Sequence, residues 1–286
     1  MIVGACGFGS TGSSAVTDYL SEFSEVRVLD RIEFTWVTDT DGLAWLAEHI
    51  LRAKNRTDDS TISVLRYIEY LESRESYYRN NGIDYDRVRR SVYDFLDSVT
   101  RARWRKANLR RAFGNPFEKL LKRSVMLYGL IPAAEKCLKK QVGWWPLSPA
   151  YFAPPSDGFM PAARRHVREL LEAMGADPSS RIVALDQPFA GNNPAAAFPF
   201  FEDPYAVVVD RDPRDNYVFL RTMLRGRNHF APLNDVKDFA AYYRGLRDGQ
   251  PYKEPSERVL CLRFEDMVYD YDKTTERLRT FLGLEE

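Results

Sequence analysis

Residues 1–14 read MIVGACGFGSTGSS, and this stretch decides the fold that the sequence predicts. Met1–Cys6 is a short apolar run typical of a buried strand, and the apolar residues of Ser13–Phe23 recur at helical spacing. Glycines between the two elements let backbone N–H groups approach an anion closely, and the helix N-terminus adds its partial positive charge. The stretch therefore predicts an anion-binding loop between a strand and a helix. The predicted binding residues are Gly7, Gly9, Ser10, Thr11, Gly12, Ser13 and Ser14.

Four more apolar runs predict the other strands of a parallel sheet. They are short and do not alternate with polar residues, as in strands that helices cover on both faces. Predicted helices separate them, so the order of elements indicates a doubly wound α/β fold, whose ligands bind beyond the carboxyl ends of the strands. The runs are Val26–Leu29, Arg181–Leu185, Tyr205–Val209 and Val259–Leu262. The segments that hold or follow the carboxyl ends are residues 7–14, 30–33, 186–193 and 210–215.

We expect one domain over residues 1–286, with an inserted helical subdomain over residues 59–141. No repeat or low-complexity tract divides the chain, and residues 59–141 carry helical patterns without a convincing strand. One of these patterns starts at Pro116, a residue favoured in the first turn of a helix. The sequence thus predicts a three-layer P-loop-type α/β fold with a central parallel sheet and a helical insertion.

Composition limits the class of partner. Among the 286 residues, 41 are Lys or Arg and 41 are Asp or Glu, and this balance argues against nucleic acid as a partner. No apolar run approaches the ~18 residues of a transmembrane helix, although a basic run around Trp104 leaves peripheral contact with a membrane open. Three widely spaced cysteines argue against a metal site and suit a reducing cytoplasm. Nothing in the pattern specifies an oligomeric state.

A second anion site is predicted where the run Tyr205–Val209 enters the sequence DRDPRD at residues 210–215. Arg211 emerges there at the carboxyl end of a buried strand, and a guanidinium offers a fixed fork of donors that suits phosphate. The alternation of Asp and Arg by itself favours a salt-bridged turn. Together with the glycine-rich loop, it favours Arg211 as a phosphate ligand.

These segments resemble the sulfotransferase family that uses 3′-phosphoadenosine 5′-phosphosulfate (PAPS). Residues 7–14, GFGSTGSS, are similar to its G-x-(R/K)-S/G-G-T loop, and residues 211–215 are similar to its R-D-P-R-D motif. Residues 263–266 and 281–284 also look like its R-Y/F-E-D and F-L-G-L segments. The resemblance covers about residues 1–53 and 158–286. It implies that the loop binds the phosphosulfate and that Arg211 binds the 3′-phosphate, with PAPS as co-substrate and no metal.

The chain departs from the family at three positions of this resemblance. Ser10 and Gln187 stand where the family usually carries a basic residue, and Phe219 replaces a usual Ser. The positive charge that meets the phosphosulfate must then come from other groups. For the missing Ser at position 219, Arg221 and Arg225, further along the predicted helix after Arg211, are candidates to compensate.

Three residues are candidates for the base that removes a proton from the acceptor, namely Glu33, Asp186 and His229. Glu33 follows the strand Val26–Leu29, and its segment is similar to that of the heparan-sulfate-type sulfotransferases, in which the matching Glu is the catalytic base. Asp186 ends another predicted strand. His229 lies in a predicted loop after an Arg-rich stretch.

The expected function is transfer of a sulfonate group from PAPS to a hydroxyl of a carbohydrate or small molecule. Asp186 also supports an alternative, because a carboxylate at the end of an apolar strand resembles the Mg²⁺ ligand of P-loop kinases. The loop has the spacing of those kinases, but Ser13 stands where they carry Lys. A nucleotide-binding protein without catalytic activity is the third alternative.

Overall fold

The computed structural model describes residues 1–52, 56–107, 147–177, 179–222, 231–248 and 256–285, together with residues 129, 130, 133, 136 and 137. Its centre is a five-stranded parallel sheet with the strand order β2-β5-β1-β6-β7. Every strand of the sheet overlaps one of the predicted apolar runs, so the prediction of the sheet is confirmed. The strands are β1 (Ile2–Gly7), β2 (Val26–Leu29), β5 (Ile182–Asp186), β6 (Pro204–Asp210) and β7 (Val259–Arg263).

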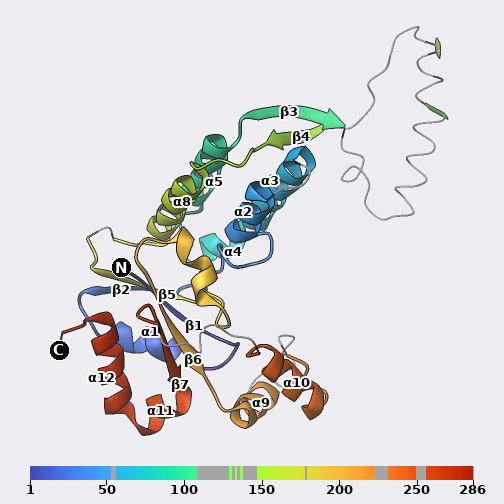
Figure 1. The fold of residues 1–286 in the computed structure, drawn as a ribbon. Coiled ribbons are helices and arrows are strands. Elements are labelled where there is room, and N and C mark those ends of the chain that lie inside the picture. Colours follow the sequence, from blue (N-terminus) through green and yellow to red (C-terminus); the bar gives the residue numbers. More distant parts are fainter. Residues whose placement is uncertain are drawn as a thin grey trace.

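Helices cover both faces of this sheet, which gives the predicted three layers (Figure 1). Successive residues of β6 show why, because Ala206 and Val208 join one buried apolar cluster while Val207 and Val209 join the other. The Val207 face packs against α1 (Ser14–Leu20), α11 (Phe264–Tyr269) and α12 (Tyr271–Leu282). The Ala206 face packs against η2 (Pro194–Phe200) and a group of longer helices.

Those longer helices form what we call the helical arm (Figure 1). Four of the five bury an apolar stripe at helical spacing, while the short α4 buries only Tyr78, and the cluster that they share is continuous with the core on the Ala206 face of the sheet. In α5, for example, Val88, Val92 and Phe95 are buried, and the carboxylate of Asp84 caps the helix by accepting from the backbone N–H of Arg87 at 3.0 Å. The arm consists of α2 (Leu43–Leu51), α3 (Arg56–Glu72), α4 (Glu75–Asn80), α5 (Tyr85–Val99) and α8 (Phe159–Ala173).

A two-stranded antiparallel ribbon at the end of the arm corrects the sequence prediction. β3 (Ala102–Ala107) lies in the segment for which only helices were expected, and its partner β4 (Leu147–Phe152) follows that segment. Strand formation here depends on pairing with a segment some 40 residues away, which a local pattern does not reveal. Most of the helix predicted after Pro116 lies outside the described residues.

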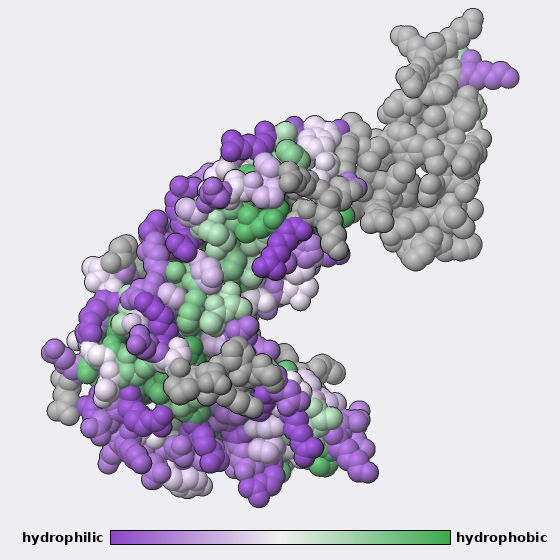
Figure 2. All heavy atoms as spheres, in the orientation of Figure 1, coloured by the Kyte–Doolittle hydropathy of each residue, from purple (hydrophilic) through white to green (hydrophobic). Residues whose placement is uncertain are grey.

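Two further helices lie at the carboxyl edge of the sheet, beyond β6. They are α9 (Pro213–Thr222) and α10 (Val236–Gly245), and they pack together through Leu220, Leu233 and Phe239. Figure 2 shows the surface hollowed between the helical arm and this pair of helices. The fold thus leaves open space beside the strand ends at which the sequence predicts chemistry.

Candidate functional site

The predicted anion-binding loop joins β1 to α1 in the middle of the sheet. Gly9, Ser10 and Gly12 have φ angles of 84°, 54° and 92°, the left-handed region that glycine adopts without strain. The backbone N–H groups of residues 9–13 donate no hydrogen bond to another described residue. They precede the N-terminus of α1, whose partial positive charge they share. Free donors at a helix N-terminus form an anion site of the kind that holds phosphate.

Close packing explains the glycines around the loop. A Cβ atom on Gly12 would lie 2.2 Å from the ring of Phe264, and one on Gly7 would lie 2.1 Å from Oγ1 of Thr11. A Cβ atom on Gly191 would lie 2.3 Å from the carbonyl oxygen of Gly7. A larger residue at any of these positions would displace a neighbouring group, which is the Phe264 ring at Gly12, the Thr11 side chain at Gly7 and the backbone at Gly191.

Two amide side chains, one after β5 and one in α9, hold the loop in place. Gln187 follows β5 and donates from Nε2 to Oγ of Ser13 at 2.8 Å. Asn216 in α9 is buried and donates from Nδ2 to the carbonyl oxygens of Gly9 and Ser10, at 3.2 Å each. Sequence reasoning missed Asn216. A polar residue in line with Leu220 on the same face of α9 was the available signal, because a buried amide requires partners.

Arg211 lies at the end of β6, where the sequence places it. Its guanidinium is held between two aromatic rings, with its centre 5.2 Å from the ring of Phe219 and 4.7 Å from that of Phe264. Its Nε is buried, and neither a hydrogen-bond partner for that atom nor an ion pair of the side chain occurs among the described residues. Phe219, which replaces the Ser of the family pattern, therefore supports the position of Arg211. An oriented cation without a counter-ion is suited to bind an anionic ligand.

The neighbouring Asp210 is fully engaged inside the protein. Its carboxylate pairs with Arg247 at 2.6 Å and accepts from the Tyr243 hydroxyl at 3.0 Å. Burial acts to raise the pKa of Asp210, but the hydrogen bonds and charge of Arg247 outweigh it and hold the pKa below its usual value. The Arg247 guanidinium also lies 4.0 Å from the ring of Phe8, so this cluster ties the end of α10 to the loop.

Two of the three candidate bases lie on the other side of the loop. The Asp186 backbone oxygen accepts from the N–H of Phe34 at 2.7 Å, which brings the exposed Glu33 close to the end of β5. Burial first, and the negative charge of Glu33 second, raise the pKa of Asp186 to about 6. Its Oδ1 is buried with no hydrogen-bond partner among the described residues. The third candidate, His229, lies outside the described residues, as does Arg225.

The strand order explains this arrangement. β1 is central, β5 on one side carries Asp186, and β6 on the other carries Arg211. All strands are parallel, so their carboxyl ends meet at one edge. The edge can bind an anion at the loop, hold a second anionic group at Arg211, and accept a proton at the carboxylates.

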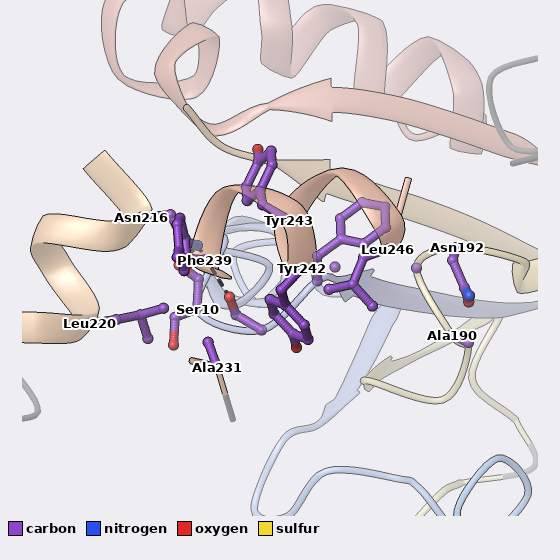
Figure 3. Close-up of a pocket in the computed structure, with 14 residues that line it drawn as sticks. Ser10, Ala190, Asn192, Asn216, Leu220, Ala231, Phe239, Tyr242, Tyr243 and Leu246 are labelled. Atoms are coloured by element: carbon purple, nitrogen blue, oxygen red, sulfur yellow. Dashed lines mark hydrogen bonds between the residues drawn. The ribbon is translucent and has the colours of Figure 1, made fainter. Parts of the chain in front are cut away.

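A pocket of about 330 Å³ adjoins the loop on the side of Gly9 and Ser10. Leu220 of α9, Tyr242 of α10 and Asn192 of the segment after β5 lie around it (Figure 3). In the described part of the chain, no group of three or more His, Cys, Asp or Glu side chains is placed to hold a metal ion. None of the helices described is both long and apolar enough to cross a membrane.

Comparison with known proteins identifies the family to which this arrangement belongs. A family model described as "Sulfotransferase family" matches residues 5–286, essentially the whole chain. Neither a curated protein nor a solved structure matches the chain.

Proposed function

The chain belongs to the sulfotransferase family and is a sulfotransferase enzyme, and from this premise we propose that its sulfonate donor is PAPS and its acceptor a hydroxyl of a carbohydrate or small molecule. The observation that carries the proposal is the pair of anion sites at one edge of the sheet. The free N–H groups of residues 9–13 fit the 5′-phosphosulfate. Arg211, held between two rings, fits the 3′-phosphate that distinguishes this donor from ordinary nucleotides.

The reaction follows from these placements. The acceptor oxygen attacks sulfur, the bond between sulfur and the phosphate oxygen breaks, and adenosine 3′,5′-bisphosphate leaves. The proton of the acceptor hydroxyl passes to a carboxylate, for which we propose Glu33 with Asp186 beside it. Negative charge that develops on the departing phosphate oxygen is met by the loop N–H groups and by the N-terminus of α1. None of the three cysteines forms a disulfide bond, and a cytoplasmic setting is part of the proposal.

One observation favours the kinase alternative. Asp186 ends the strand next to β1, where P-loop kinases have a carboxylate that binds Mg²⁺. Two others weigh against it. Position 13 carries Ser, and its hydroxyl is engaged by Gln187, so that no Lys at this position reaches a terminal phosphate. Arg211 is half-buried, its Nε has no hydrogen-bond partner among the described residues, and a phosphate at the ribose 3′ position, which ATP lacks, would supply a counter-ion.

Titration of an Arg211→Ala variant tests the donor. We expect adenosine 3′,5′-bisphosphate to bind the variant about 1.5–3 kcal/mol more weakly than it binds the unmodified protein. This is the range for hydrogen bonds to charged groups. AMP, which lacks the 3′-phosphate, should lose little affinity. Arg214→Ala is the matched control, because Arg214 is exposed and paired with Asp212. Equal losses for the two nucleotides would show that Arg211 does not bind the 3′-phosphate.

A further inference from the structure

The two-stranded ribbon of β3 and β4 lies at the end of the helical arm that is remote from the sheet (Figure 1). We propose that this ribbon is a docking surface for a membrane whose lipids carry negative charge. The inference concerns where the enzyme is held and not what it transfers, so it does not rest on the identity of the donor.

Charge is distributed unevenly along a chain whose formal net charge is zero. Residues 101–152, which comprise the ribbon and the segment between its strands, contain 12 of the 41 basic residues and 2 of the 41 acidic ones. This leaves 29 basic and 39 acidic residues in the rest of the chain. The segment between the strands leaves β3 and returns to β4, so both of its ends are fixed at the ribbon. An anionic surface therefore attracts this part of the molecule and repels the remainder, which favours an approach with the arm first.

Hydrogen bonds fix the ribbon to the arm by the edge of β4. The buried hydroxyl of Thr61 in α3 donates to the backbone oxygen of Tyr151 at 3.0 Å and accepts from its backbone N–H at 3.1 Å. The hydroxyl of Ser60 donates to the backbone oxygen of Ala153 at 3.1 Å. In the described part of the chain, no further strand pairs with β3. β3 is thus the outer strand of a ribbon that the arm holds in a fixed place.

This outer strand and the residue before it present cations and a large aromatic side chain to solvent. Arg101, Arg103 and Arg105 are exposed, and Arg103 is held by an ion pair with Asp97. Neither Arg101 nor Arg105 forms an ion pair with another residue that the structure describes. Trp104 lies between them in sequence, with 39% of its surface exposed. Cations and indole rings together are typical of surfaces that bind the headgroup layer of a membrane.

The tryptophans favour a membrane over a soluble polyanion. Three of the five tryptophans of the chain, Trp104, Trp144 and Trp145, occur in residues 101–152. Indole rings are favoured at the boundary between headgroups and hydrocarbon, whereas contacts to the phosphates of a nucleic acid duplex require only polar and cationic groups. Successive side chains of a strand point to opposite faces, so an approach by the edge of β3 brings both the Arg row and Trp104 to the headgroups.

Flotation of the full chain with lipid vesicles tests the proposal. The probes are vesicles of phosphatidylcholine alone and of phosphatidylcholine mixed with phosphatidylserine, each at low and at high salt. The variant combines Arg101→Glu with Arg105→Glu. Its matched control combines Lys273→Glu with Arg277→Glu, which makes the same change in charge at exposed positions of α12, on the face of the sheet opposite to the arm. Circular dichroism and the Tm check that both variants fold.

We expect the unmodified protein to bind vesicles with phosphatidylserine at least about tenfold more tightly than vesicles without it, and to lose this preference at high salt. The ribbon variant should bind them about 25-fold more weakly or less, because one cation near an anionic bilayer contributes about fivefold. The α12 control should bind as the unmodified protein does. Trp104→Ala should weaken binding several-fold, while Tyr269→Ala, which removes an exposed ring from α11, should not.

Two results with the unmodified protein would overturn the inference, namely no binding to the phosphatidylserine vesicles and equal binding to both kinds of vesicle. An equal loss in the ribbon variant and in the α12 control would also overturn it, because net charge and not the ribbon would then decide binding. Tighter binding to a DNA duplex or to a heparin fragment at the same salt would assign the ribbon to a soluble polyanion instead. All these outcomes are independent of the binding of adenosine 3′,5′-bisphosphate, which tests the proposed function.

Discussion

Ser13 stands where P-loop kinases carry Lys, and Gln187 stands where the sulfotransferase pattern usually has a basic residue. Here Gln187 donates a hydrogen bond to the Ser13 hydroxyl. Asn216 fixes the same loop through two carbonyl oxygens. These residues hold the backbone in shape but bring no charge. The favourable potential for a phosphosulfate therefore comes from the oriented N–H groups, from the N-terminus of α1 and from Arg211.

A conservative substitution tests the proposed role of Glu33 in proton transfer. Glu33→Gln preserves size and hydrogen bonding but cannot accept a proton, so we expect the single-turnover rate to fall by roughly 10²–10⁴-fold, the usual contribution of a positioned base. Affinity for adenosine 3′,5′-bisphosphate should hold, since Glu33 is not proposed to bind the nucleotide. Loss of the Glu33 charge should also lower the pKa of Asp186 from about 6, which is measured by NMR titration.

Asp186→Asn provides the comparison for this prediction. If Glu33→Gln keeps its rate within a few-fold and Asp186→Asn loses it, Asp186 is the base. In that case the rate of the unmodified enzyme rises with pH through about 6 and levels off above it, because only the ionised carboxylate accepts a proton.

At the scale of elements, the junction of β7 and α11 connects the two anion sites. Its Phe264 ring covers Gly12 of the loop and also flanks the Arg211 guanidinium, while Glu265 accepts from the backbone N–H of Asp212 at 2.7 Å. One short segment thus supports both the loop and the strand end that bears Arg211. The sequence offered only a resemblance at this segment, and the structure gives it a physical role.

We predict that Phe264→Ala weakens binding of adenosine 3′,5′-bisphosphate by about 0.5–2 kcal/mol, the range for a cation held against an aromatic face. Phe264→Tyr keeps the ring and should bind as the unmodified protein does. Calorimetric titration of both variants measures the effect. Unchanged affinity in Phe264→Ala would show that the ring does not position Arg211.

At the scale of the whole molecule, a buried histidine joins three helices of the arm. His166 of α8 is hydrogen-bonded through Nε2 to the Tyr67 hydroxyl of α3 at 2.7 Å and through Nδ1 to the Ser91 hydroxyl of α5 at 2.6 Å. Burial lowers its pKa to about 3, so the imidazole is neutral in the folded protein. The role of His166 is therefore structural, since it connects three helices inside the arm.

Acid should therefore destabilise the arm through His166. The folded-state pKa lies below the unfolded value of about 6.5, so the unfolded chain binds the extra proton between these values. The contribution is fully present above about pH 6.5 and is lost as the pH falls toward 3, by at most about 1.4 kcal/mol per pH unit. Urea unfolding from pH 7.5 to 5 should show a shallower pH dependence for His166→Gln than for His49→Gln. Equal slopes would contradict this assignment.

Local pattern predicted the loop and the individual strands, although the strands pair with partners far away in the sequence. The apolar runs and the glycines of residues 7–12 carry that information within a few residues. What the sequence did not predict depends on distant partners. β3 requires β4, and Asn216 requires the carbonyl oxygens of Gly9 and Ser10, about 200 residues earlier in the chain. The roles of Glu33 and Arg211 remain predictions that ligand binding and kinetics must test.

Thermal unfolding with ligands tests the central claim, the identity of the donor, most directly. A ligand that binds only the folded state stabilises it by roughly 2.7 kcal/mol at a hundredfold excess over Kd. Our account predicts that adenosine 3′,5′-bisphosphate raises the Tm in the presence of a chelator, and that ATP with Mg²⁺ raises it much less. An increase produced only by ATP with Mg²⁺ would contradict the account.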